Sequence, residues 1–120
     1  MIYISWKKYF KWLNDDKFIV GGKGNGNISI ISYKDKKIVH NIDNVFQCFC
    51  IYIIKKQNIF LIGGKSENIK IDNINDYKGI GIIEGIHNNF IRGIINLNDD
   101  SIASFSDDKS IKVYNLILPK

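Results

Sequence analysis

Short runs of apolar residues, most of them isoleucine, recur along the whole chain and are separated by polar segments. Many runs alternate between apolar and polar positions, as at Phe49, Ile51 and Ile53, and a period of two residues is typical of a half-buried β-strand. No window of helical length shows a clean period of 3.6 residues. The pattern therefore predicts strands at residues 8–13, 17–22, 27–32, 36–42, 46–54, 58–64, 68–73, 79–85, 90–97, 100–106 and 110–117.

The apolar pattern also repeats at a fixed distance. Three similar segments begin at Asp16, Asn58 and Asp100, and each is followed by a turn and a second apolar run. Phe18, Phe60 and Ile102 are equivalent positions in these segments and are spaced 42 residues apart. A period of about 42 residues is the length of one four-stranded blade of a β-propeller. The repeat predicts one region with blades at approximately 1–43, 44–86 and 87–120, the last of which is incomplete.

Composition supports a chain built from strands. The 120 residues include 26 isoleucines, 14 asparagines and one alanine. Isoleucine is branched at Cβ and suits strands, whereas a chain with so little alanine is poor helix material. Because 45% of the residues are apolar and 24% are charged, the chain is not expected to be disordered.

The charge is mild and does not predict a nucleic-acid partner. The net charge is +5, and 16 of the 17 basic residues are lysines. They stand mostly beside predicted turns, as in the pairs at 7–8, 36–37 and 55–56, rather than in one basic stripe. The start of the chain shows no signal peptide, and no apolar stretch approaches the length of about 18 residues that a membrane span needs. We expect a cytoplasmic protein, with the nucleus as the alternative.

The third repeat carries a family resemblance. It reads Gly85-Ile86-His87, an apolar strand, a serine-rich strand, the turn Asp107-Asp108, and then Ile111-Lys112-Val113-Tyr114-Asn115. This order resembles a WD40 repeat, with Tyr114-Asn115 where that family usually has Trp-Asp. The resemblance covers about 30 residues of the 42-residue period and extends weakly to the other two repeats. It implies an all-β fold, a partial WD40 β-propeller of about three four-stranded antiparallel blades.

The resemblance also implies a structural role for four side chains. WD40 repeats contain a hydrogen-bonded chain that joins a histidine, a serine, an aspartate and a tryptophan. By position, these residues would be His87, Ser104, Asp108 and Tyr114. Such a chain helps to fix how the loops leave the blade.

The resemblance implies a non-enzymatic scaffold that binds proteins or peptides through its loops. The candidate interaction residues on one loop face are Lys23, Asn25, Lys65, Glu67, Asn88, Asn89 and Lys109. One alternative is an accessory propeller domain of a larger enzyme, such as a kinase or ligase assembly. A third possibility is a phosphoinositide-binding propeller, because Phe90-Ile91-Arg92-Gly93 is similar to the Phe-Arg-Arg-Gly motif of such proteins.

Three blades do not fill a ring, because closed propellers have about four to eight blades. The chain could be a fragment of a larger propeller, it could complete a ring with another chain or with copies of itself, or it could be an open arc. Neighbouring blades from the same gene, from another chain or from a second copy are therefore expected partners.

Other chemistry is not indicated. Cys48 and Cys50 are predicted to lie on one face of a strand as small core thiols rather than as a disulfide. His40 and His87 are the two histidines, and the spacing of a zinc site is missing. No pattern indicates nucleophilic or acid–base catalysis. We predict no catalytic residues, no metal and no cofactor.

Overall fold

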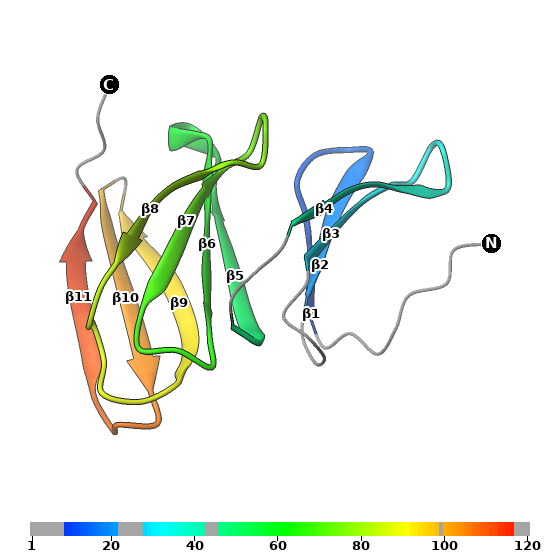
Figure 1. Ribbon diagram of the computed structural model, residues 1–120. Coiled ribbons are helices and arrows are strands. Elements are labelled where there is room, and N and C mark those ends of the chain that lie inside the picture. Colours follow the sequence, from blue (N-terminus) through cyan, green and yellow to red (C-terminus); the bar gives the residue numbers. More distant parts are fainter. Residues whose placement is uncertain (1–8, 22–27, 43–45, 99, 117–120) are drawn as a thin grey trace.

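The computed structural model describes residues 9–21, 28–42, 46–98 and 100–116. They form three antiparallel sheets that stand side by side (Figure 1). The first sheet contains β1 (Tyr9–Trp12), β2 (Lys17–Gly21), β3 (Ile28–Ser32) and β4 (Lys37–Ile42). The second contains β5 (Cys48–Ile54), β6 (Ile59–Gly64), β7 (Ile69–Asn73) and β8 (Gly79–Ile83), with the 3-10 turn η1 (Lys55–Gln57) between β5 and β6. The third contains β9 (Ile91–Asn98), β10 (Ser101–Ser106) and β11 (Ile111–Asn115).

The strands occur in sequence order within each sheet, so each sheet is a meander of hairpins. Every strand that the apolar pattern predicts overlaps an observed strand. The prediction of an all-β fold with two four-stranded sheets and one three-stranded sheet is therefore confirmed.

Local turn chemistry closes several of these hairpins. The Asn14 side-chain oxygen accepts hydrogen bonds from the backbone N–H groups of Asp16 and Lys17, at 2.9 and 2.7 Å. Asn58 takes a left-handed conformation, with φ of 57°, where η1 ends and β6 begins. Asparagine tolerates these conformations better than most residues because its short polar side chain bonds to nearby backbone.

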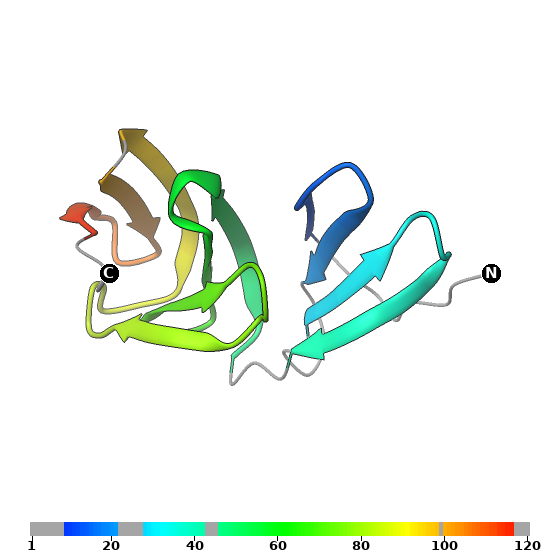
Figure 2. The same ribbon diagram turned by 90° about the horizontal axis from the view of Figure 1, so that it is seen from above.

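The first strands of the three sheets, β1, β5 and β9, lie next to one another, and the sheets spread apart toward their last strands (Figure 2). Apolar side chains fill both junctions between sheets. Ile19, Ile28 and Ile30 of the first sheet pack with Phe60 and Ile62 of the second. The second junction joins the second and third sheets, with buried residues that include Leu61, Ile69, Ile71, Ile91 and Ile102.

The 42-residue repeat assigns each strand position to one side of its sheet. Ile30 and Ile71 are equivalent by the repeat, and both point toward the following sheet. Phe60 and Ile102 are also equivalent, and both point toward the preceding sheet. The second sheet is therefore apolar on both faces, and its strand β6 is buried at every position.

The prediction that Cys48 and Cys50 share one face of a strand is wrong. Cys48 belongs to the junction between the first and second sheets, and Cys50 belongs to the junction between the second and third. A β-bulge between them is the physical reason, since an extra residue reverses the alternation of side chains. Both side chains are buried and neither forms a disulfide. Burial raises the pKa of the Cys50 thiol to about 12.

Candidate functional site

Three connections gather at one end of the second and third sheets, which is the lower end in Figure 1. They are the β6–β7 loop at 65–68, the β8–β9 connection at 84–90 and the β10–β11 turn at 107–110. The β8–β9 connection crosses from the last strand of one sheet to the first strand of the next. It therefore brings loops from two sheets into contact.

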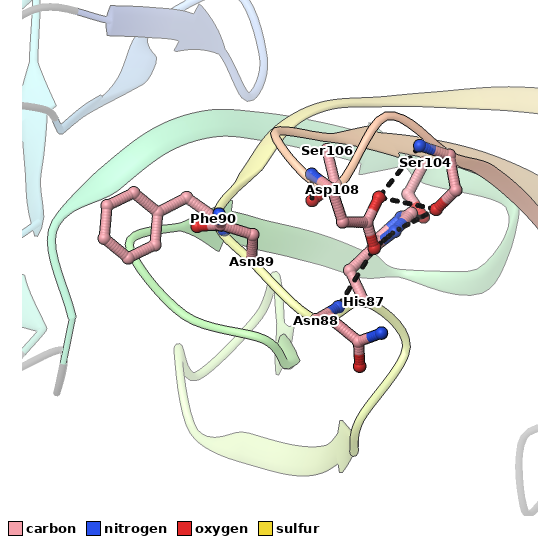
Figure 3. A network of polar contacts seen from close by, with 8 residues as sticks. His87, Asn88, Asn89, Phe90, Ser104, Ser106 and Asp108 are labelled. Carbon is pink, nitrogen blue, oxygen red and sulfur yellow. Dashed lines mark hydrogen bonds and ion pairs between the residues drawn. The ribbon is translucent and has the colours of Figure 1, made fainter.

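A hydrogen-bonded network around His87 holds this crossing in place (Figure 3). The side chain of His87 is buried, and its Nε2 atom lies 2.8 Å from the hydroxyl oxygen of Ser104. Its Nδ1 atom lies 3.0 Å from Asp108 Oδ2 and 3.0 Å from the hydroxyl oxygen of Ser110. The connection before β9 is thus bonded to strand β10 and to the β10–β11 turn.

The carboxylate of Asp108 lies at the centre of this network. Its Oδ1 accepts from the Ser110 hydroxyl at 2.6 Å and from the Ser110 backbone N–H at 2.9 Å. Its Oδ2 accepts from the Asn88 backbone N–H at 2.9 Å. These hydrogen bonds, above all that from the Ser110 hydroxyl, hold the pKa of the Asp108 carboxyl well below its usual range. Since a carboxylate only accepts, His87 Nδ1 is the donor toward Asp108, and in a neutral imidazole Nε2 then accepts from the Ser104 hydroxyl.

The structure brings three of the four residues of the expected chain together and leaves out the fourth. His87, Ser104 and Asp108 are in hydrogen-bond contact. The Tyr114 ring packs instead against the apolar junction between the second and third sheets, and within the described part of the chain its hydroxyl has no hydrogen bond to this group. Ser110, which sequence reasoning missed, supplies the additional hydroxyl. The signal for it is its position two residues after Asp108, where a side chain in the same turn can reach back.

Serine, histidine and aspartate are also the members of a hydrolase triad, with a similar pattern of contacts. In this protein the Ser104 side chain is fully buried. An open depression beside the network is lined by Gly85, Ile86, His87, Asn88, Asp108, Ser110 and Lys112, and Ser104 is not among these residues. A substrate would have no path to the hydroxyl. The arrangement is therefore suited to holding loops and not to nucleophilic attack.

Further hydrogen bonds join the three loops to one another. The His87 N–H donates to the Glu67 carbonyl oxygen at 3.4 Å, and the Gly85 N–H donates to Asn68 Oδ1 at 2.8 Å. The Asp107 N–H donates to the Phe90 carbonyl oxygen at 3.0 Å. The β8–β9 connection is consequently bonded to both turns that flank it.

The candidate interaction residues within the described ranges all lie in these loops. The exposed residues are Lys65, Glu67, Asn88, Asn89 and Lys109. Lys23 and Asn25 lie outside the described residues. The exposed group carries charges of both signs and two amides, a surface suited to polar contacts with another macromolecule.

Arg92 lies on the same end of the third sheet and is already paired. Its Nε and Nη2 atoms donate to the two carboxylate oxygens of Asp107, at 2.9 and 2.7 Å. Its guanidinium also lies over the Phe49 ring, 4.4 Å from the ring centre. The pairing with Asp107 offsets the charge that a phosphoinositide headgroup would need.

Asp72 is a buried carboxylate that sequence reasoning did not single out. It lies in β7, its side chain is fully buried, and neither carboxylate oxygen has a hydrogen bond in the described structure. Lys70 Nζ forms an ion pair with it at 3.4 Å. Burial raises the pKa of the Asp72 carboxyl, and the charge of Lys70 opposes that shift.

Metal ligands do not gather in the described ranges, where no cluster of three or more His, Cys, Asp or Glu side chains could hold an ion. Among the same residues, no helix has the length and apolar character to cross a bilayer.

In comparisons with known proteins, no family model and no curated sequence matches the chain. Its fold does match solved structures. The crystal structure of the WD40 β-propeller domain of Doa1 has a TM-score of 0.69 and 22% identity, over 87% of this chain and 34% of that one. The crystal structure of the WD40 repeats of RRP9 has a TM-score of 0.74 and 20% identity, over 84% of this chain and 32% of that one. The chain spans about a third of the length of these structures, and its fold is that of part of a WD40 β-propeller.

Proposed function

We propose that this partial WD40 β-propeller is a non-enzymatic interaction scaffold that binds a protein or peptide through the loop face formed by residues 65–68, 84–90 and 107–110. The observation that carries the proposal is the bonding of these three loops to one another through His87, Asp108 and the backbone of Glu67. A surface that is ordered before binding loses little conformational entropy when a partner arrives.

The opposite loop face is connected differently. There, the Tyr33 N–H donates to the Asp16 carbonyl oxygen and the Lys34 N–H donates to Asp16 Oδ1, so the bonds join two turns of a single sheet. The Ile74 N–H likewise donates to the Asn58 carbonyl oxygen within the second sheet. The loop face around His87 is favoured because its bonds extend across two sheets and offer a larger fixed surface.

The proposed partner is an extended polar peptide or a protein loop. Lys65 and Lys109 would attract acidic side chains, while Asn88 and Asn89 offer both donors and acceptors. Exposed charges of this kind set orientation and association rate more than affinity. We also propose that neighbouring propeller sheets accompany the chain in its functional form and that it works in the cytoplasm, with the nucleus as the alternative.

The test is selection of binding peptides from a displayed random library on the purified chain. Enriched peptides should bind at least about tenfold more weakly to the Lys65→Glu/Lys109→Glu variant, because both changes place like charge against an acidic ligand. The matched control is Lys34→Glu/Lys78→Glu, which makes the same charge change on the opposite loop face. Failure to enrich any peptide, or loss of binding only in the control variant, would reject this loop face as the binding site.

A further inference from the structure

The outer side of the third sheet is an apolar face that nothing covers within the described structure. We call it the β11 face, and it consists of Ile95, Ala103, Phe105, Ile111 and Val113. Ile111 is 73% exposed and Val113 is 63% exposed. The other side of the same sheet carries Ile102 and Tyr114 and packs against the second sheet.

The 42-residue repeat shows what kind of surface this is. Ile111 is equivalent to Ile28 and Ile69, both of which are 0% exposed. Val113 is equivalent to Ile30 and Ile71, which are 0% and 6% exposed. In the first two sheets these positions are covered by the side of the next sheet that carries Phe60 or Ile102. The β11 face therefore has the pattern of a junction between sheets that lacks its second half.

The second half of such a junction lies at the other end of the same chain and is partly exposed. We call it the β1 face, and it consists of Phe10, Trp12, Phe18 and Tyr33. By the repeat, Phe18 is equivalent to Phe60 and Ile102, which fill the two internal junctions. Phe10, Tyr33 and Trp12 are 60%, 58% and 49% exposed. Large aromatic side chains contribute most to stability when they are buried.

One position distinguishes the β11 face from the internal junctions. By the repeat, Phe105 is equivalent to Gly21 and Gly63 of the first two sheets. The internal junction leaves no room for a side chain at Gly63, because an added Cβ atom would lie 2.9 Å from Cys50 Sγ and from Ile91 Cγ2. In the third sheet the Phe105 ring lies over Gly93, where an added Cβ would approach Phe105 Cζ to 2.0 Å. The ring forms an apolar platform at this end of the face, and the aromatic β1 face offers rings that can stack on it.

We propose that the β11 face of one copy binds the β1 face of a second copy, head to tail, and that two copies close into a ring of six sheets. Three sheets from each copy give a number within the range of about four to eight at which propellers close. The contact repeats the pairing of sides that already occurs twice within the chain. Closure matters because a head-to-tail contact that does not close would extend into a filament.

The experiment measures mass by light scattering across a concentration series. The wild-type chain is expected to reach twice the 13.8 kDa mass of one copy. Ile111→Glu on the β11 face and Trp12→Glu on the β1 face should each weaken association at least about a hundredfold, because a carboxylate would be buried without a partner. Mixing the two variants should restore a single contact between their intact faces and give a one-to-one dimer that cannot close.

The matched control is Lys112→Glu, which puts a carboxylate on the opposite side of β11, beside the depression near His87. It should associate like the wild type, and circular dichroism should show that all variants fold. A wild-type chain that remains monomeric at millimolar concentration would overturn the proposal, because the β11 face would then not bind a second copy. A dimer that persists in Trp12→Glu alone would also overturn it, because the contact would then join two β11 faces. These outcomes concern sheet faces and are independent of peptide binding at the loops.

Discussion

The clearest test of the loop architecture is the replacement of His87 by alanine. His87 is 2% exposed and contacts two hydroxyl groups and one carboxylate. Asp108 keeps its bonds from Ser110 and from the Asn88 backbone when the imidazole is removed. The hydroxyl of Ser104 is fully buried and loses its partner, so most of the cost arises there.

Leaving one buried polar group without a partner costs about 1–3 kcal/mol. Part of the imidazole volume also becomes a cavity, so we expect His87→Ala to lower the free energy of unfolding by about 2–3 kcal/mol. Ser104→Ala should cost about 1–2 kcal/mol, because it leaves His87 Nε2 unpaired. The double variant should lose no more than His87→Ala alone, because the orphaned hydroxyl has then been removed as well. The expected coupling is about 1–2 kcal/mol.

The assay is urea unfolding followed by circular dichroism, with the same denaturant slope required for every variant. His40→Ala provides a matched control, because His40 is the other histidine of the chain and lies exposed on β4. It removes an exposed ring contact with Tyr77 and should lower stability by less than about 1 kcal/mol. If His87→Ala is no more harmful than His40→Ala, or if the losses from His87→Ala and Ser104→Ala simply add, the network does not hold these loops.

Three further predictions concern other parts of the structure. Asp72→Asn should raise stability by about 1 kcal/mol at neutral pH, because the cost of burying the carboxylate outweighs its ion pair with Lys70. Burial raises the pKa of the Asp72 carboxyl, so the folded wild type binds the proton more tightly than the unfolded chain does. The wild type therefore loses stability as the pH rises through the pKa of Asp72 in the folded protein. At acid pH, unfolding titrations should give the wild type and the variant the same stability. Gly64→Ala should lower the free energy of unfolding in urea by about 1–3 kcal/mol, because the added Cβ would collide with the Gln47 carbonyl oxygen. Gly81→Ala is the control and should be tolerated, because an added Cβ there meets nothing within 4 Å. Tyr114→Phe should leave the melting temperature within error and change the free energy of unfolding by less than about 0.5 kcal/mol, because its hydroxyl stands outside the His87 network.

Much of the fold follows from local pattern. Alternation of side chains is a property of the extended backbone, so strands such as those around Ile19 and Ile71 can be read without knowing what they pack against. The turn residues work over a few positions, which is why Asn14 and Asn58 mark where hairpins close. The distances between Phe18, Phe60 and Ile102 then give the number of sheets.

The sequence predicts only part of the hydrogen-bonded network around His87. Its partners in β10 and in the following turn could be named from a family resemblance, because they stand at fixed positions in the repeat. Ser110 could not be separated from Tyr114 on sequence, since the choice depends on which side chain reaches the imidazole in three dimensions. The Tyr114 ring packs against the apolar junction between the second and third sheets instead, where burial of an aromatic ring is favourable.

The sequence by itself therefore determined the strands, the turns and the repeat, because these depend on side-chain alternation and on short-range hydrogen bonds. Only the tertiary structure decided which faces are buried. A bulge places Cys48 and Cys50 in different junctions between sheets. Asp72 is buried, whereas Ile111 and Val113 are exposed. Burial depends on whether a neighbouring sheet covers a face, and equivalent residues in the same repeat pattern can be fully enclosed in one sheet and exposed in the next.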